Sequence, residues 1–169
     1  MSGAGDSEQF AVTVLGCSGS YNAVDIPCSG YLVQAGGVNL WMDCGNGTLG
    51  NLQRHIDVAD LDAVVVTHSH PDHCVDLFGL HVLATYGLER TGIPVIAAPE
   101  VAARMLPLAR DWRTTFEWRE VADGDRAEIG AASLRFSSTD HPVPTLAVEV
   151  GAAGKRLVYT ADTGPSWSP

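Results

Sequence analysis

The stretch VVVTHSHPDHCVDL (Val64–Leu77) joins a run of valines to six residues, 68–73, that include three histidines and an aspartate. The valines are continuous and do not alternate with polar residues, which is typical of a β-strand covered on both faces. Side chains two positions apart in an extended chain project to the same face. The stretch therefore predicts a buried strand, residues 61–70, whose end directs His68 and His70 toward one point.

The residues after this strand predict a turn into a helix. Pro71 favours extended backbone at His70 and suits the first position of a helix, expected over residues 72–86. The turn would bring Asp72 and His73 beside the first two histidines. Zinc usually takes three or four protein ligands, so one ion would not easily use all four of these donors. Two ions about 3.5–4 Å apart fit the set better.

A polar turn after a buried strand is the alternative explanation for this stretch. The chain has six histidines, and three of them lie between His68 and His73. They also follow the carboxyl end of a strand, where α/β proteins tend to bind ligands. Both observations favour a metal site. His55 and His81 fall in expected helices and are assigned to the helix surface or to hydrogen-bonded core positions.

Other predicted strands also end in His or Asp. His141 in SSTDHPVPT follows residues 133–139, and Asp162 in LVYTADTGP follows residues 156–160. Each is weak evidence alone, because Asp is common in turns. Together with the first cluster they form a set of metal-ligand types. Asp43 in WMDCG ends another predicted strand, and it could orient a metal-bound histidine or simply form a turn.

The remaining segments predict one mixed α/β (α+β) layered domain over residues 1–169. Gly36-Gly37 is expected to be the turn of a hairpin. A helix at residues 100–110 should end or kink at Pro107. The other expected elements are a helix at residues 46–56 and strands at residues 10–16, 31–35, 38–42, 93–99, 116–121, 127–129, 133–139, 145–150 and 156–160.

The composition argues against several classes of partner. The chain has 20 acidic and 10 basic residues, for a net charge of −10, which on average repels nucleic acid. No apolar run approaches the ~20 residues of a membrane span, so no membrane is expected. The N-terminus has no signal-peptide pattern. The four cysteines match no C-x-x-C spacing and are expected to be reduced thiols of a cytoplasmic protein.

Several motifs resemble those of the metallo-β-lactamase fold. The segment HSHPDH resembles its HxHxDH signature, and His141 and ADTGP resemble its third and fourth motifs. The segments LGCSGS, WMDCGNGTLGNLQRH and HPVPT resemble the ribonuclease Z-like branch. The resemblance spans nearly the whole chain in the right order and implies an αββα sandwich with two zinc ions. It assigns His68, His70 and His141 to one ion, Asp72 and His73 to the second, and Asp162 to both. Mn²⁺ or Fe²⁺ would also suit these ligands.

Two substrate classes compete within the branch that the chain resembles. Ribonuclease Z enzymes process tRNA precursors and carry a long arm between the third-motif His and the bridging Asp. Here residues 142–161 fill that interval as a predicted hairpin, which leaves no room for the arm. Together with the acidic composition, this favours a small phosphodiester such as a cyclic nucleotide over extended tRNA binding.

The implied chemistry is metal-assisted hydrolysis, in which two ions lower the pKa of a water to ~7. Asp72 is the candidate to orient this nucleophile or accept its proton, and a role as ligand alone is equally compatible. A lactamase or thioester hydrolase of the same fold would use the same metals. A barrel-type amidohydrolase also has an HxH pair, but it needs ~250 residues and has no HxDH continuation.

The resemblance breaks down at the C-terminal end of the sequence. The family has a final His ligand for the second ion downstream of the ADTGP-like motif, and this sequence ends at Pro169. The expectation is a C-terminally truncated domain whose second half is incomplete. A non-catalytic metal-binding fragment is then an alternative to an enzyme. Self-association as a homodimer would cover an unpaired sheet edge.

Overall fold

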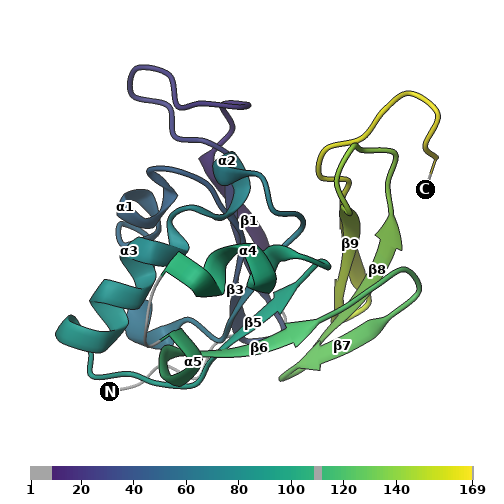
Figure 1. Ribbon diagram of the computed structural model, residues 1–169. Coiled ribbons are helices and arrows are strands. Elements are labelled where there is room, and N and C mark those ends of the chain that lie inside the picture. Colours follow the sequence, from purple (N-terminus) through teal and green to yellow (C-terminus); the bar gives the residue numbers. More distant parts are fainter. Residues whose placement is uncertain (1–8, 109–111, 169) are drawn as a thin grey trace.

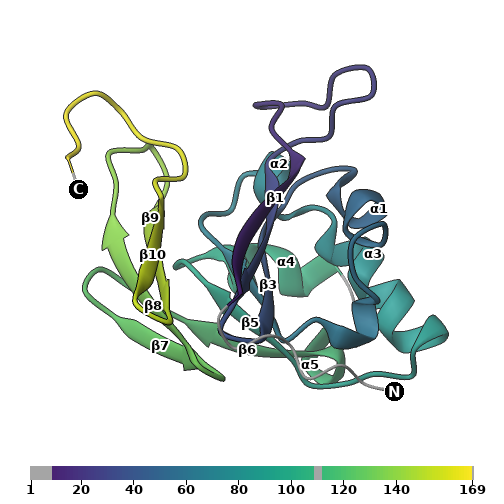
Figure 2. The same cartoon turned by 180° about the vertical axis from the view of Figure 1, so that it is seen from behind.

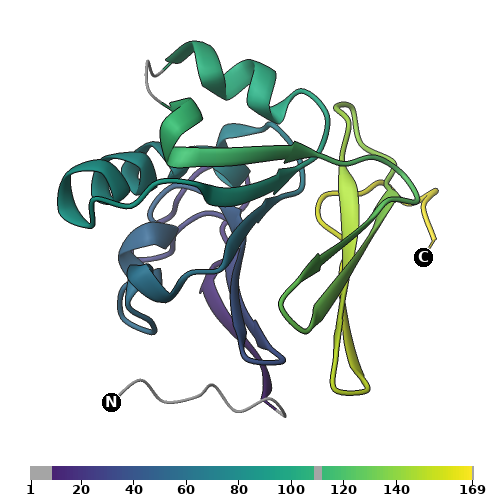
Figure 3. The same cartoon turned by 90° about the horizontal axis from the view of Figure 1, so that it is seen from below.

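The computed structural model describes residues 9–108 and 112–168. Two sheets lie side by side, and the helices cover the outer face of the larger one (Figures 1 and 3). This arrangement of mixed sheets and helices confirms the predicted fold class. No helix among the described residues covers the outer face of the smaller sheet (Figure 3).

The larger sheet has six strands in sequence order, antiparallel from β1 to β3 and parallel from β3 to β6. Gly36 and Gly37 turn the hairpin between β2 and β3 with φ of 61° and 83°, the left-handed geometry that a two-residue hairpin turn requires. The strands are β1 (Phe10–Gly16), β2 (Gly30–Ala35), β3 (Val38–Cys44), β4 (Ala63–Val66), β5 (Ile93–Ala97) and β6 (Phe116–Glu120).

Strand β4 is buried along its whole length, as the valine run predicts. It pairs in parallel with β3 on one side and β5 on the other, with Val64 opposite Val95. The expected strand over residues 61–70 is too long, however, because β4 ends at Val66. The next amide, that of Thr67, donates a hydrogen bond to the Asp43 carboxylate instead of a neighbouring strand. His68 and His70 therefore lie in the loop after the strand.

The expected helix over residues 72–86 is wrong in its continuity, because it is interrupted at Val75 and Asp76 and its last turn is π-helical. The helix breaks where the Asp76 N–H donates to the Cys44 carbonyl and the Asp76 carboxylate accepts from the Leu49 N–H. These bonds connect the break to the end of β3 and to the helix that follows it, residues 48–52. The pieces are α2 (Pro71–Cys74), α3 (Leu77–Val82) and the π-helical turn η2 (Leu83–Gly87).

The other helices are short. The helix expected at residues 46–56 is confined to α1 (Thr48–Leu52), and a 3₁₀ turn, η1 (Val58–Asp60), follows it. The helix expected at residues 100–110 begins as α4 (Val101–Met105) and continues as the 3₁₀ turn η3 (Leu106–Leu108), which contains Pro107. The last two residues of the expected helix, 109 and 110, lie outside the described ranges. Sequence patterns did not predict α5 (Trp112–Thr115). Across the described ranges, no helix is long and apolar enough to cross a membrane.

The smaller sheet is antiparallel, in the order β10-β9-β8-β7 (Figure 2). In β8, buried and exposed residues alternate, so Leu134 and Phe136 face the core. The strand predictions hold to within a residue or two for β7 (Arg126–Ile129), β8 (Ala132–Ser138), β9 (Leu146–Ala152) and β10 (Lys155–Tyr159).

The hydrophobic core extends over both faces of the larger sheet. Consecutive residues Leu40, Trp41 and Met42 of β3 are all buried, so neither face of this strand is open. The edge strands are less covered: Val14 in β1 and Val158 in β10 are 59% and 48% exposed. Self-association through these edges stays a prediction, which the oligomeric state in solution would test.

Candidate metal centre

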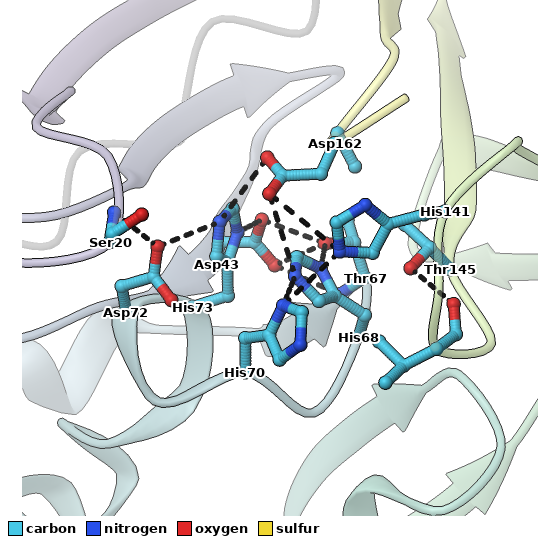
Figure 4. A network of polar contacts seen from close by, with 12 residues as sticks. Ser20, Asp43, Thr67, His68, His70, Asp72, His73, His141, Thr145 and Asp162 are labelled. Carbon is cyan, nitrogen blue, oxygen red and sulfur yellow. Dashed lines mark hydrogen bonds and ion pairs between the residues drawn. The ribbon is translucent and has the colours of Figure 1, made fainter. Parts of the chain in front are cut away.

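The predicted site residues converge where strands of both sheets end (Figure 4). Asp43 lies near the end of β3, and His68 follows β4. The smaller sheet contributes His141 from the loop after β8 and Asp162 from the segment after β10. The remaining three, His70, Asp72 and His73, come from the turn into α2 and its first residues.

Four of these side chains form a compact group of ligand types. Nε2 of His68 lies 3.1 Å from Nδ1 of His70, and Nε2 of His141 lies 3.2 Å from the same atom. One carboxylate oxygen of Asp162, Oδ2, is 3.9 Å from both Nε2 atoms. One ligand atom from each of the four residues lies within 4.8 Å of all the others.

A second group lies on the other side of Asp162. Nε2 of His73 is 3.5 Å from Oδ2 of Asp72 and 3.5 Å from Oδ1 of Asp162. The two oxygens of Asp162 therefore face two different sets of donors (Figure 4). The backbone supports this position, because the Thr139 hydroxyl donates to the Asp162 carbonyl oxygen at 2.8 Å.

Asp43 is fully buried beneath both groups and accepts hydrogen bonds at both oxygens. Oδ1 accepts from the Thr67 N–H at 2.8 Å. Oδ2 lies 2.7 Å from Nδ1 of His73, 2.9 Å from the Thr67 hydroxyl and 2.9 Å from the Tyr159 hydroxyl. An ionised carboxylate can only accept, so His73 carries its proton on Nδ1 and its Nε2 points to the centre.

Thr67 extends this arrangement to His68. Its hydroxyl lies 3.1 Å from Nδ1 of His68. Because the Thr67 proton is directed at Asp43, the network assigns Nδ1 of His68 as the donor and leaves its Nε2 lone pair facing His70. Burial, followed by the neighbouring His73, lowers the pKa of His68 to about 4, so this imidazole is neutral at pH 7.

The charge on His73 is governed by its carboxylate neighbours. Burial by itself lowers the pKa of His73, but the hydrogen bond and charge of Asp43, followed by Asp162 and Asp72, outweigh it and raise the pKa. Within the described residues, the ion pairs of these three carboxylates are all with histidines. The cluster therefore has an excess of negative charge that a bound cation would neutralise.

The donor set fits a divalent metal ion. Ligands 2.0–2.1 Å from a tetrahedral ion lie roughly 3.3–3.4 Å apart, close to the 3.1 and 3.2 Å between the imidazole nitrogens of His68, His70 and His141. A cation between these three nitrogens would accept a lone pair from each neutral imidazole. Imidazole and carboxylate ligands suit zinc, manganese and iron alike.

The comparison with known protein families agrees with this geometry. A family model described as a beta-lactamase superfamily domain matches residues 38–167, most of the chain. The chain belongs to the beta-lactamase superfamily. The resemblance expected from the HxHxDH, third and fourth motifs is thereby confirmed.

Relatives within the superfamily include bacterial and archaeal proteins. The chain is 35% identical to Rv1339 of Mycobacterium tuberculosis over 96% of its length, which covers 63% of that protein. It is 30% identical to probable metallo-hydrolase YhfI of Bacillus subtilis, over 90% of this chain and 63% of YhfI. It is also 30% identical to ribonuclease Z of Methanopyrus kandleri, over 82% of this chain and 49% of that enzyme.

The solved structure of YhfI from Bacillus subtilis has the same fold. It matches with a TM-score of 0.80 at 30% identity, over 89% of this chain and 61% of that chain. This member of the superfamily thus spans about three fifths of the length of Rv1339 and YhfI.

Sequence reasoning missed three residues that support the centre. The Ser20 N–H donates to Oδ2 of Asp72 at 2.7 Å, from a backbone with φ of 62°. Thr67 and Tyr159 both bond to Asp43. The glycine-rich segment LGCSGS, which ends at Ser20, signals a tight loop there. No local pattern signals the two Asp43 contacts, because Asp43 is 24 positions from Thr67 and 116 from Tyr159.

Proposed function

We propose that this chain is a metal-dependent hydrolase that uses two divalent ions, preferably zinc, to cleave a small phosphodiester such as a cyclic nucleotide. The orientation of Asp162 carries the proposal. Its Oδ2 lies 3.9 Å from His68 and His141, whereas its Oδ1 lies 3.5 Å from His73. A carboxylate between two sets of metal-ligand types is suited to bridge two ions.

The ligands divide between the two ions according to these distances. One ion would take His68, His70 and His141, the second would take Asp72 and His73, and Asp162 would join both. When bound, such a pair of ions supplies Lewis acidity that lowers the pKa of a water and offsets the charge developing on the phosphate. Asp43 and Thr67 would hold the ring nitrogens in the tautomers that leave Nε2 of His68 and His73 free.

Asp72 is proposed to orient the attacking water or to accept its proton. Its Oδ2 is held by the Ser20 N–H at 2.7 Å, so the carboxylate cannot turn freely. Within the described part of the chain, only this oxygen has a partner, which leaves Oδ1 as the candidate proton acceptor. Its position within the second group of donors suits that role.

The segment between His141 and Asp162 supports a small substrate. It is filled by β9, β10 and the tight turn between them, with Ala153 and Gly154 at φ of 48° and 74°. This hairpin has no extension that could grip a large RNA. The net charge of −10 likewise opposes a polyanion more than a single phosphodiester. The relative named ribonuclease Z makes a tRNA precursor the second candidate substrate.

Metal content and turnover of bis-(p-nitrophenyl) phosphate test the proposal together. We expect two ions per chain by elemental analysis, and hydrolysis that chelation stops and added Zn²⁺ restores. His70→Ala should lose the first ion and abolish turnover. His55→Ala is the matched control, because His55 is exposed and lies outside the centre. A parent chain that binds ions without hydrolysing phosphodiesters would instead support a binding role.

A panel of substrates separates the alternatives within the superfamily. We expect turnover of 3′,5′-cyclic nucleotides and none of a chromogenic β-lactam, a thioester or a tRNA precursor. Cleavage of the tRNA precursor at a rate above that of the cyclic nucleotide would favour the second candidate. We also propose that the chain acts in the cytoplasm, since all four cysteines are unpaired.

A further inference from the structure

Tyr159 connects the two sheets directly beneath the candidate centre. It belongs to β10 of the smaller sheet, and its hydroxyl donates to Oδ2 of Asp43 in β3 of the larger sheet at 2.9 Å. Its ring packs against Tyr31 of β2, with 4.9 Å between the ring centres and a tilt of 54°. The aromatic contact therefore holds the hydroxyl against the buried carboxylate.

The oxygen that accepts from Tyr159 also accepts from Nδ1 of His73, at 2.7 Å. The last torsion of an Asp side chain is soft, so its plane is set by its hydrogen-bond partners. Asp43 also has φ of 53°, a left-handed conformation that persists only when its surroundings hold it. Loss of the Tyr159 donor would leave Oδ2 with only the Thr67 hydroxyl and the Nδ1–H of His73 as partners among the described residues, and so would loosen the carboxylate plane that directs this Nδ1–H.

Tyr159 is also close in sequence to Asp162, the other ligand type that faces His73. Oδ1 of Asp162 lies 3.5 Å from Nε2 of His73, yet the two residues reach the centre from different sheets. Tyr159 is linked to Asp162 through the backbone at the end of β10, and to His73 through Asp43. Tyr159 is thus connected to both ligands, to Asp162 by the chain and to His73 by a hydrogen-bonded carboxylate.

We propose that Tyr159 is a positioning residue that aligns His73 with Asp162 for the second ion, acting through Asp43. The inference rests on the proposed two-ion function. A positioning role differs from a general packing role in its effect on metal affinity. Asp162 faces both groups of donors, so loosening β10 would weaken the binding of both ions. Misalignment of His73 would weaken the binding of the second ion only.

Stepwise titration of the metal-free protein with Zn²⁺ by calorimetry tests the inference through affinity and not through turnover. For Tyr159→Phe we expect the first step to match the parent and the second to weaken at least about tenfold, as for other residues that orient metal ligands. Tyr31→Phe is the matched control, since it also removes a tyrosine hydroxyl from this ring pair. Among the described residues, the Tyr31 hydroxyl has no hydrogen-bond partner.

A Tyr159→Phe protein with the parental second step would overturn the inference and leave the two-ion proposal intact. Equal weakening of both steps would also overturn it, in favour of a packing role. Titration of the parent protein alone tests the proposed function, because a parent chain that does not bind two ions would refute it. If Tyr159→Phe does not fold, the inference can be tested on the parent protein by NMR. We expect a nuclear Overhauser contact between the His73 Nδ1 proton and the Tyr159 ring, and its absence would contradict the proposed role of Tyr159.

Discussion

Replacing Asp43 by asparagine should reverse the tautomer of His73. The Thr67 N–H cannot turn away, so the oxygen of the new amide side chain would keep that 2.8 Å bond and place the amide NH₂ where Oδ2 now faces His73. Nδ1 of His73 must then accept a hydrogen bond, and its proton moves to Nε2. A protonated Nε2 cannot bind a metal ion.

The size of the effect follows from the bonds at Oδ2. Restoring the lone pair on Nε2 of His73 in the variant would break the neutral hydrogen bond from the amide NH₂ to Nδ1, worth about 0.5–1.5 kcal/mol, and leave a buried donor unpaired, at a cost of about 1–3 kcal/mol. The two effects reach about 1.5–4.5 kcal/mol. Because each 1.4 kcal/mol is tenfold, we expect the second ion to bind roughly 10- to 10³-fold more weakly.

Calorimetric titration with Zn²⁺ measures this loss, and elemental analysis after dialysis gives the number of ions retained. Asp62→Asn is the matched control: the carboxylate of Asp62 accepts only from the Asn39 N–H among the described residues, at 2.7 Å, and an amide oxygen can keep that bond. This control should bind both ions normally. An Asp43→Asn protein that binds two ions with parental affinity would refute the tautomer argument.

Three further predictions concern stability and accessibility. Each ion at 100 times its dissociation constant should raise the free energy of unfolding by about 2.7 kcal/mol, a gain that EDTA removes; an unchanged melting temperature would contradict the site. Gly45→Ala should destabilise the protein by roughly 1–3 kcal/mol in urea unfolding, because its Cβ would lie 1.9 Å from the Asp72 carbonyl oxygen. Gly50→Ala, in α1 with open space around it, should instead stabilise by up to ~1 kcal/mol, and equal effects would contradict this difference. Ellman's reagent should modify only exposed Cys17 in the native protein and the three buried cysteines after unfolding; rapid modification of a second thiol would be inconsistent with their burial.

Local patterns in the sequence were sufficient for much of the fold. The valine run before His68 identifies β4, because a strand covered on both faces needs apolar residues at every position. Gly36-Gly37 identifies the β2–β3 hairpin, because both residues adopt left-handed geometry. The HxHxDH spacing and the strand-end residues His141 and Asp162 indicated which side chains would meet.

Contacts between distant parts of the chain decided the rest. The break at Asp76 is invisible in helix periodicity, because it arises from bonds to Cys44 and Leu49 of another segment. The end of β4 at Val66 likewise depends on the Asp43 carboxylate.

The sequence by itself determined the ligand types of the centre and the strand that presents the first of them, since both follow from residue identity and local spacing. Only the tertiary structure decided how the ligands are oriented. Asp162 turns its two oxygens to different groups, and Tyr159 reaches Asp43, because two sheets pack together at this point. Pairing between sheets is set by packing over the whole core, which no local pattern of residues encodes.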